Sequence, residues 1–235
     1  DPSCQLCGKK QTLTHVLAGC AVALGLGRYT WRHNRVLTHL AEAVGTAIEE
    51  ANKTTPAAKG PMKFVREGDR AWSIESRGKP PSLLDHAQDW KMAMDLKGSS
   101  HPYPQEIKET GQRPDIVVYS RTAKSFILLE LTVPLENSMD EWHQIKLAKY
   151  QPLTEHLASG GFRATVLAAE IGARGFVGYS AHKVCKKLGL PMRQTTRYLR
   201  AMSEAAERAS CWIWMKRDTK EGGASGGSQG VSQGV

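Results

Sequence analysis

IVVY at 116–119 and FILLELTV at 126–133 decide the fold of this chain. Each run is short and apolar, and the polar segment SRTAK separates them, so the runs predict two neighbouring strands joined by a turn. Pro134 ends the second strand, because proline cannot donate a hydrogen bond to a β-ladder. Glu130 is the single charged residue of the second run, so its carboxylate must be paired, bind a metal ion or lie at a strand edge.

The segment after these strands predicts a helix and a further strand. Residues 137–158 predict a helix that ends at Gly160 and Gly161, and residues 164–172 predict a strand. The order strand, turn, strand, helix, strand is typical of an α/β fold. The apolar positions of this helix are expected to be Trp142, Ile145, Leu147, Leu153 and Leu157.

Further helices are predicted on both sides of this block. Residues 31–50 place apolar side chains at three- and four-residue spacing, which predicts an amphipathic helix. Residues 180–189 and 193–217 also predict helices, the second with Trp212 and Trp214 packed in the core. The final segment GGASGGSQGVSQGV has the composition of a flexible tail.

The segment between the first helix and the two strands has a less regular pattern of apolar residues. Residues 52–62 contain two prolines and a glycine, which predicts a linker. Residues 64–67 predict a short strand, and residues 83–96 predict a helix that leads into a strand.

Four potential metal ligands lie within the first 20 residues. They are Cys4, Cys7, His15 and Cys20. Three thiolates and one imidazole are ligand types that zinc prefers, and a closed set of four is typical of a structural site. The alternative is that the four residues are unrelated. Cys185 and Cys211 are far away in the sequence and are expected to be ordinary buried cysteines.

A second candidate site combines carboxylates and lysines. Asp115 opens the first strand and Glu130 lies in the second, so a short turn could bring both carboxylates to one edge. Two carboxylates form a hard oxygen site for Mg²⁺, which can activate water and stabilise the charge of a phosphodiester. Lys146 and Lys149, on the following helix, could orient the water or counter the phosphate charge. The alternative is that Asp115 caps a turn, Glu130 forms a structural ion pair and the lysines are solvated.

This ordered set of acids and a lysine resembles the PD-(D/E)xK superfamily of restriction-like nucleases. The resemblance implies a restriction-endonuclease-like core, in which helices flank a mixed sheet, preceded here by the Cys-Cys-His-Cys finger and a helix. The sequence departs from the pattern at ELT (130–132), because the superfamily has lysine where this chain has Thr132. A lysine that migrated to the following helix would restore the set. The missing lysine supports an alternative function, that of a catalytically inactive nucleic-acid-binding module.

A longer series of motifs resembles the C-terminal region of non-LTR retrotransposon polyproteins that carry a restriction-like endonuclease. The series is the finger, RHN (32–34), RPD (113–115), ELTVP (130–134), KLAKY (146–150), RGF (174–176) and EAAERASCWIWMKR (204–217). The resemblance implies an enzyme that nicks target DNA, so that the exposed 3′ end primes reverse transcription. It further implies Mg²⁺ or Mn²⁺ in the nuclease site, Zn²⁺ in the finger and a nuclear location.

The resemblance also implies roles for individual residues of the carboxylate site. Asp115 and Glu130 match the family's metal ligands, and Lys146 and Lys149 both match its helix, so either could be the catalytic lysine. Tyr150 follows these lysines, and it could position a phosphate or only pack.

The remaining candidates are a further acid and several DNA contacts. Glu106 is a candidate additional acid, and Arg32 and His33 could contact DNA or hold the finger to the nuclease body. The other candidate DNA contacts are Arg113, Lys183, Lys187, Arg193 and Arg197. Pairs one helical turn apart can neutralise phosphates without reading the base sequence; the alternative is a solvated helix face.

The charge distribution agrees with a nucleic acid partner. The 235 residues carry a net charge of +9. Residues 111–160 hold 5 basic and 6 acidic side chains, whereas residues 161–235 hold 12 and 5. A slightly acidic segment next to a basic one suits a metal beside a polyanion. A zinc-dependent protein-interaction domain is a weaker alternative, and a membrane span is excluded because no run approaches 18 apolar residues.

These expectations divide the chain into four parts. They are a zinc finger at 1–27, a helix and linker at 28–62, a restriction-like endonuclease domain at 63–220 and a Gly/Ser-rich tail at 221–235. The start at Asp1 suggests a fragment of a longer polypeptide. The implied partners are double-stranded target DNA and the reverse transcriptase part of the same polyprotein, with element RNA as a further candidate.

Overall fold

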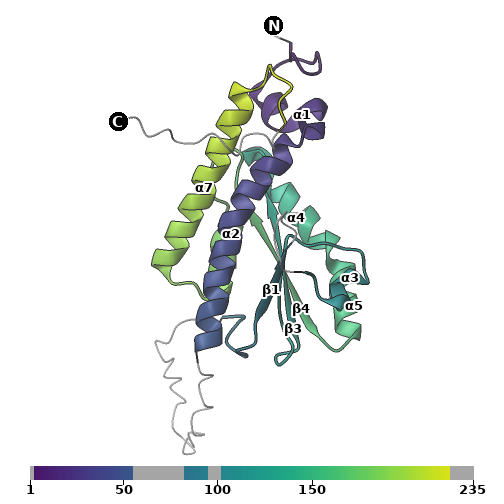
Figure 1. Cartoon of the computed structure of the whole chain (residues 1–235), viewed down its shortest axis with the longest axis vertical. Helices are drawn as coiled ribbons and strands as arrows, with labels where there is room; N and C mark the ends of the chain where they lie inside the picture. The colour runs from purple at the N-terminus through teal and green to yellow at the C-terminus, as the bar shows by residue number, and fades with distance from the viewer. Residues whose placement is uncertain (1–2, 55–81, 95–101, 223–235) are drawn as a thin grey trace, which may run out of the picture.

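The computed structural model describes residues 3–54, 82–94 and 102–222, in which helices cover both faces of a four-stranded sheet (Figure 1). The strands are β1 (Lys91–Met94), β2 (Ile116–Ser120), β3 (Ser125–Thr132) and β4 (Arg163–Glu170), in this order across the sheet. The β1–β2 and β2–β3 pairs are antiparallel, and β3 and β4 are parallel. The mixed α/β architecture expected from the sequence is therefore confirmed, with an open mixed sheet.

Strand β3 is the centre of the fold, and all eight of its residues are buried. Successive side chains of a strand point to opposite faces. Ile127 and Leu129 join a core that includes residues of α2 (Arg28–Lys53) and α7 (Met192–Met215), whereas Phe126 and Leu128 join a second core with residues of α5 (Gln151–Ser159). By the same alternation Glu130 faces the second side.

Two long helices cover one face of the sheet. Helices α2 and α7 lie side by side there, and α6 (Tyr179–Lys187) packs against the same core (Figure 1). Helices α3 (Gln105–Lys108), α4 (Met139–Lys149) and α5 lie on the other side (Figure 1). The helices expected at 31–50, 180–189 and 193–217 are thus present with slightly different ends. None of the described helices combines the length and apolar character that a membrane span requires.

The helix predicted over 137–158 is broken in the structure. A 3₁₀ turn, η2 (Glu136–Ser138), precedes α4, and Tyr150 separates α4 from α5. Pro152 explains the break, because proline has no N–H with which to continue the helical hydrogen bonds from α4. The expected apolar positions are only partly right: Leu153 and Leu157 are buried, but Trp142 and Ile145 are 41% and 45% exposed.

The helix predicted at the start of 83–96 is absent. Residues 83–86 form turns, and only β1 follows as a strand. Polar side chains compete with the helix here. The Ser82 amide donates to Asp85 Oδ2, and the Leu84 amide donates to Ser82 Oγ. The strand expected at 64–67, most of the linker at 52–62 and most of the tail at 221–235 lie outside the described residues.

The N-terminal segment packs on α2 and α7, where Val16 and Leu17 form a small cluster with Ile213. It contains a π-helical turn, η1 (His15–Gly19), and a short helix, α1 (Ala21–Gly25). The guanidinium of Arg28 is fully buried and donates to the carbonyls of Lys216, Thr219 and Glu221. Trp212 packs against Trp31 with 4.8 Å between ring centroids.

Two expectations for the C-terminal helix are wrong. Trp214 was expected in the core but is 37% exposed, with Arg217 over its ring, and Cys211 was expected to be buried but is exposed. The buried positions of this part of α7 are instead Ala206, Ala209 and Ile213.

Candidate functional site

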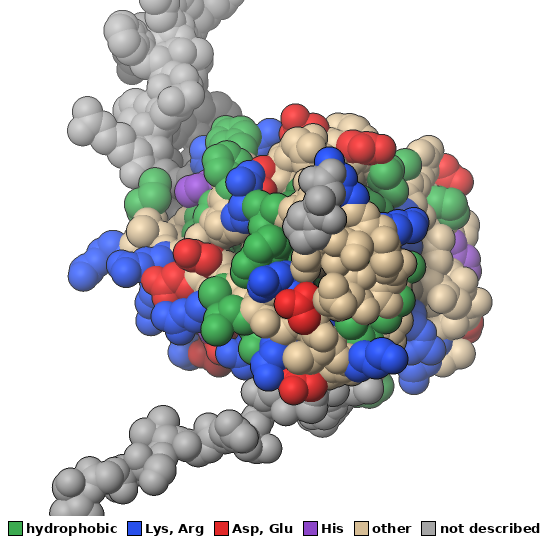
Figure 2. Space-filling view, turned by 90° about the horizontal axis from the view of Figure 1, so that it is seen from above, with side chains coloured by type: hydrophobic (Ala, Val, Ile, Leu, Met, Phe, Trp, Pro, Cys, Tyr) green, Lys and Arg blue, Asp and Glu red, His purple; other side chains and the backbone are tan. Residues whose placement is uncertain are grey.

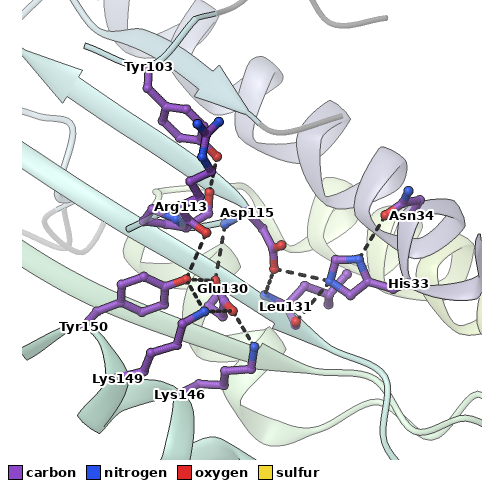
Figure 3. A network of polar contacts seen from close by, with 11 residues as sticks. His33, Asn34, Tyr103, Arg113, Asp115, Glu130, Leu131, Lys146, Lys149 and Tyr150 are labelled. Atoms are coloured by element: carbon purple, nitrogen blue, oxygen red, sulfur yellow. Dashed lines mark hydrogen bonds and ion pairs between the residues drawn. The ribbon is translucent and has the colours of Figure 1, made fainter. Parts of the chain in front are cut away.

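The carboxylate of Glu130 is the hub of a buried polar network (Figure 3). The Lys146 ammonium lies 2.5 Å from Glu130 Oε1, and the Lys149 ammonium lies 3.6 Å from the same oxygen. The Tyr150 hydroxyl donates to Glu130 Oε2 at 2.7 Å, and the Asp115 amide donates to it at 3.3 Å. These donors compensate the cost of a buried negative charge.

Asp115 reaches this network because of the hairpin register. Ile116 pairs with Leu129, so Asp115 stands opposite Glu130 at the end of the β2–β3 ladder. Its Oδ2 accepts a hydrogen bond from the Leu131 amide at 2.8 Å. The structure thus places Asp115 next to Glu130 at one edge of the hairpin: its amide contacts Glu130 Oε2, while its carboxylate contacts the Leu131 amide.

His33 joins the network from α2, across the sheet edge (Figure 3). Its Nε2 lies 3.3 Å from Asp115 Oδ2 and 3.2 Å from the Leu131 carbonyl oxygen. Burial lowers the pKa of His33, but the hydrogen bond with Asp115 and the charge of that carboxylate outweigh it, so the net pKa is raised. The sequence suggested that His33 contacts DNA or holds the finger to the nuclease body. It gave no sign that His33 lies beside Asp115, because contacts between α2 and the β2–β3 hairpin leave no local sequence pattern.

Lys146 and Lys149 differ in how closely they approach the Glu130 carboxylate. The Lys146 side chain is 19% exposed and contacts Glu130 directly, whereas the Lys149 side chain is 46% exposed and donates to the Tyr150 hydroxyl at 2.9 Å. The geometry therefore favours Lys146 as the lysine that acts with Glu130. Thr132, which stands where the PD-(D/E)xK pattern has lysine, is buried, and its Oγ1 has no hydrogen-bond partner among the described residues.

Tyr150 is held by the break between α4 and α5. It is fully buried, and its single hydroxyl proton can go to Glu130 Oε2 at 2.7 Å or to the Arg113 carbonyl oxygen at 3.1 Å. Burial raises the pKa of the phenol, and the negative charge of Glu130 raises it further, so Tyr150 stays protonated as a donor. Arg113 is exposed; only its carbonyl is part of the network.

Several other candidates lie away from the network. The Glu106 carboxylate pairs with Arg121 and does not approach Glu130. The Arg32 guanidinium is buried and donates to the Leu17 carbonyl, Ser210 Oγ and the Val133 carbonyl. Arg32 therefore connects the N-terminal segment to α7 and β3, which agrees with the alternative that it holds the finger to the body and not with an exposed DNA contact. The basic residues of α6 and α7 (Lys183, Lys187, Arg193 and Arg197) are exposed.

The Cys/His cluster forms a second site at the N-terminus. Cys4, Cys7, His15 and Cys20 place one ligand atom each within 4.8 Å of one another. Cys7 Sγ lies 3.1 Å from His15 Nε2, and Cys4 Sγ lies 4.0 Å from Cys20 Sγ. Tetrahedral zinc with Zn–S bonds of about 2.3 Å requires sulfurs roughly 3.8 Å apart, so the four residues could hold a metal ion such as zinc.

The surroundings of the cluster shift the pKa values of the Cys4 and Cys7 thiols in opposite directions. Burial raises the pKa of the Cys4 thiol, but hydrogen bonds with the backbone at Cys7 and Leu6 outweigh it and lower the pKa to about 7. A backbone hydrogen bond at Lys9 lowers the pKa of Cys7, but burial and the neighbouring sulfurs raise it more, so its net pKa is raised. Closely spaced thiolates repel one another, and a bound cation removes that repulsion.

Comparisons with models of known protein families and with curated proteins find no match to this chain.

Proposed function

We propose that this chain is a metal-dependent DNA endonuclease domain of the restriction-like, PD-(D/E)xK type. It would act in a non-LTR retrotransposon polyprotein, in the nucleus, and nick target DNA to supply the primer for reverse transcription. The observation that carries the proposal is that Asp115, directly before β2, adjoins Glu130 of β3, and that Lys146 of α4 contacts the same glutamate. The motif series that runs through the chain supports the same family.

The donor set at this edge suits a hard divalent cation. The Asp115 carboxylate, the Glu130 carboxylate and the Leu131 carbonyl are oxygen ligands of the kind that Mg²⁺ prefers. These groups would hold Mg²⁺ or Mn²⁺, and the ion would supply Lewis-acid stabilisation of the phosphodiester charge.

The protein's own residues have distinct roles in this proposal. Tyr150 and the Asp115 amide fix the orientation of Glu130, because both donate to Oε2. Lys146, partly open to solvent beside Oε1, would orient the attacking water and counter the charge that develops on the phosphate. The exposed lysines and arginines of α6 and α7 would contact phosphates.

The first test is the nicking of supercoiled plasmid by the wild-type chain. We expect open-circular product in Mg²⁺ or Mn²⁺ and none when EDTA replaces the metal, because the proposed chemistry requires a divalent cation. Agarose gels give the rate of product formation, and a gel shift in EDTA gives DNA retention under conditions without cleavage.

One observation favours a second candidate function, that of an inactive nucleic-acid-binding module. Both Glu130 oxygens already accept hydrogen bonds from the protein, and Thr132 replaces the lysine of the pattern. DNA retention without nicking over a range of plasmids and duplexes would favour this candidate over the endonuclease.

The lysine pair offers a sharper prediction within the proposed site. Lys146→Met should lower the nicking rate about 100-fold, because one charge-stabilising donor is lost. Lys149→Met, its matched control one turn along α4, should lower the rate by less than about fivefold, since its ammonium is farther from Glu130. Single-turnover nicking rates at saturating protein measure both effects. A larger loss in Lys149→Met would reverse the assignment of the two lysines.

A further inference from the structure

A cavity of about 290 Å³ lies directly beside the carboxylate network. It is bounded by α2, by the end of β3 and the segment after it, and by α4. It shares His33, Leu131 and Lys146 with the network. Its volume is near the lower end of the range for small-molecule sites, roughly 300–1,000 Å³, which is a size for one nucleotide and not for a duplex.

Among the described residues, the charged side chains that line this cavity are all basic. Its described lining contains Arg32, His33 and Lys146 and no aspartate or glutamate. The second cavity against α4, of about 590 Å³, differs, because Asp140 and Glu170 lie among its lining residues. A basic lining beside a proposed phosphodiesterase site fits an anionic ligand.

Arg32 strengthens this charge asymmetry. It is 3% exposed, and within the described part of the chain it forms no ion pair; its hydrogen bonds go to two carbonyls and a hydroxyl. Its Nε has no hydrogen-bond partner among the described residues. Burial lowers the pKa of Arg32 to about 10, so the guanidinium remains charged at neutral pH. A buried cation of this kind favours an anion in the adjacent cavity.

Trp142 supplies an aromatic surface at the same cavity. It lines the cavity although its side chain is 41% exposed. Trp142 and Lys146 are four residues apart on α4, so they lie on one helix face, one turn from each other. Pro134 and Leu135 provide apolar contacts in the same lining. An exposed aromatic next to a lysine is the combination that binds single-stranded nucleic acid, because bases stack on the ring while the cation meets the backbone.

We propose that this cavity binds one unpaired nucleotide, whose base stacks on Trp142 and whose phosphate lies toward Lys146, while Arg32 contributes only its buried charge. The inference rests on the proposed function in that it takes a nucleic acid as the ligand and places the nucleotide next to the cleavage site. It adds that this nucleotide is unpaired, and it assigns the exposed tryptophan of α4 a binding role.

The test measures binding in EDTA, so that cleavage plays no part. The probe is a short single-stranded DNA with 2-aminopurine at its centre, whose fluorescence falls when the base stacks on an aromatic ring. We expect quenching by the wild-type chain, about tenfold weaker affinity with loss of quenching in Trp142→Ala, and affinity within about threefold of wild type in Trp142→Phe. The matched control is Trp214→Ala, an exposed tryptophan on α7 outside the cavity, which should bind as the wild type does.

A second probe separates the base from the backbone. The same oligonucleotide with an abasic site at its centre should compete about tenfold less well for the wild-type chain and equally well for Trp142→Ala. The proposal is overturned if Trp142→Ala binds and quenches as the wild type does, if Trp214→Ala weakens equally, or if the abasic probe competes fully. Nicking without Trp142-dependent binding would refute only the nucleotide site, and Trp142-dependent binding without nicking would refute only the endonuclease.

Discussion

Glu130→Gln is expected to lower the nicking rate by about 1,000-fold while DNA retention stays close to that of the wild type. The carboxylate sits between Lys146, Tyr150 and the Asp115 amide, and glutamine keeps its shape while removing its charge. Loss of a metal-binding charge costs roughly 4 kcal/mol of transition-state stabilisation, which corresponds to that rate factor. Plasmid nicking and a gel shift in EDTA measure the two properties.

Glu106→Gln is the matched control for this prediction. It removes one carboxylate from a helix near the same sheet, but Glu106 pairs with Arg121 and does not contact Glu130. We expect its nicking rate within about twofold of the wild-type rate. Thermal unfolding of both variants identifies any effect that comes from loss of folding. Wild-type nicking by folded Glu130→Gln would contradict the assignment of Glu130 to the active site, and it would leave Glu130 as a structural ion pair.

The second large effect is expected from a metal ion such as zinc in the Cys/His cluster: its removal should affect the N-terminal segment alone. The apolar cluster around Cys4, Cys20 and Ala23 is small, and the segment packs on the body through Val16 and Leu17, so the residues around Cys4 and Cys7 should depend most on the metal. Structural zinc contributes on the order of 10 kcal/mol in small metal-dependent folds, so chelation should release the cluster while the sheet remains folded. Hydrogen exchange should rise in residues 3–20 and stay low in β3.

Thiol counting gives this prediction a precise outcome. The chain has five free cysteines, of which Cys211 is exposed and Cys185 is buried in the core. With zinc bound, a thiol reagent should titrate the Cys211 thiol alone; after chelation it should titrate four thiols, and Cys185 should react only after denaturation. The Cys211→Ser variant identifies the first thiol. Equal reactivity of the cluster thiols before and after chelation would show that they bind no metal.

The hairpin shows how far the sequence alone could predict the site. Two apolar runs separated by a short polar turn allow one simple pairing, and that pairing sets Asp115 opposite Glu130. The metal cluster is equally local, because all four ligands fall within 17 consecutive residues, Cys4 to Cys20. In both cases the residues that meet are close in the chain, so spacing and strand geometry suffice.

The errors arose where contacts join distant segments. Trp142 and Ile145 have the composition of a buried helix face, yet the break at Tyr150 and the packing of α4 leave them exposed. The sequence left two roles open for Arg32, and its three hydrogen-bond partners, from the N-terminal segment, the end of β3 and α7, favour the role of holding the finger to the body.

By itself, therefore, the sequence predicted the strands of the hairpin, the placement of Asp115 and Glu130 at one edge of it and the membership of the Cys/His cluster. Only the tertiary structure decided that Lys146 lies closer to Glu130 than Lys149 does, and that His33 joins Asp115 from α2. The physical reason is that strand pairing follows from alternation along the chain. The rotation of a helix over a sheet, in contrast, depends on the packing of side chains from the whole core.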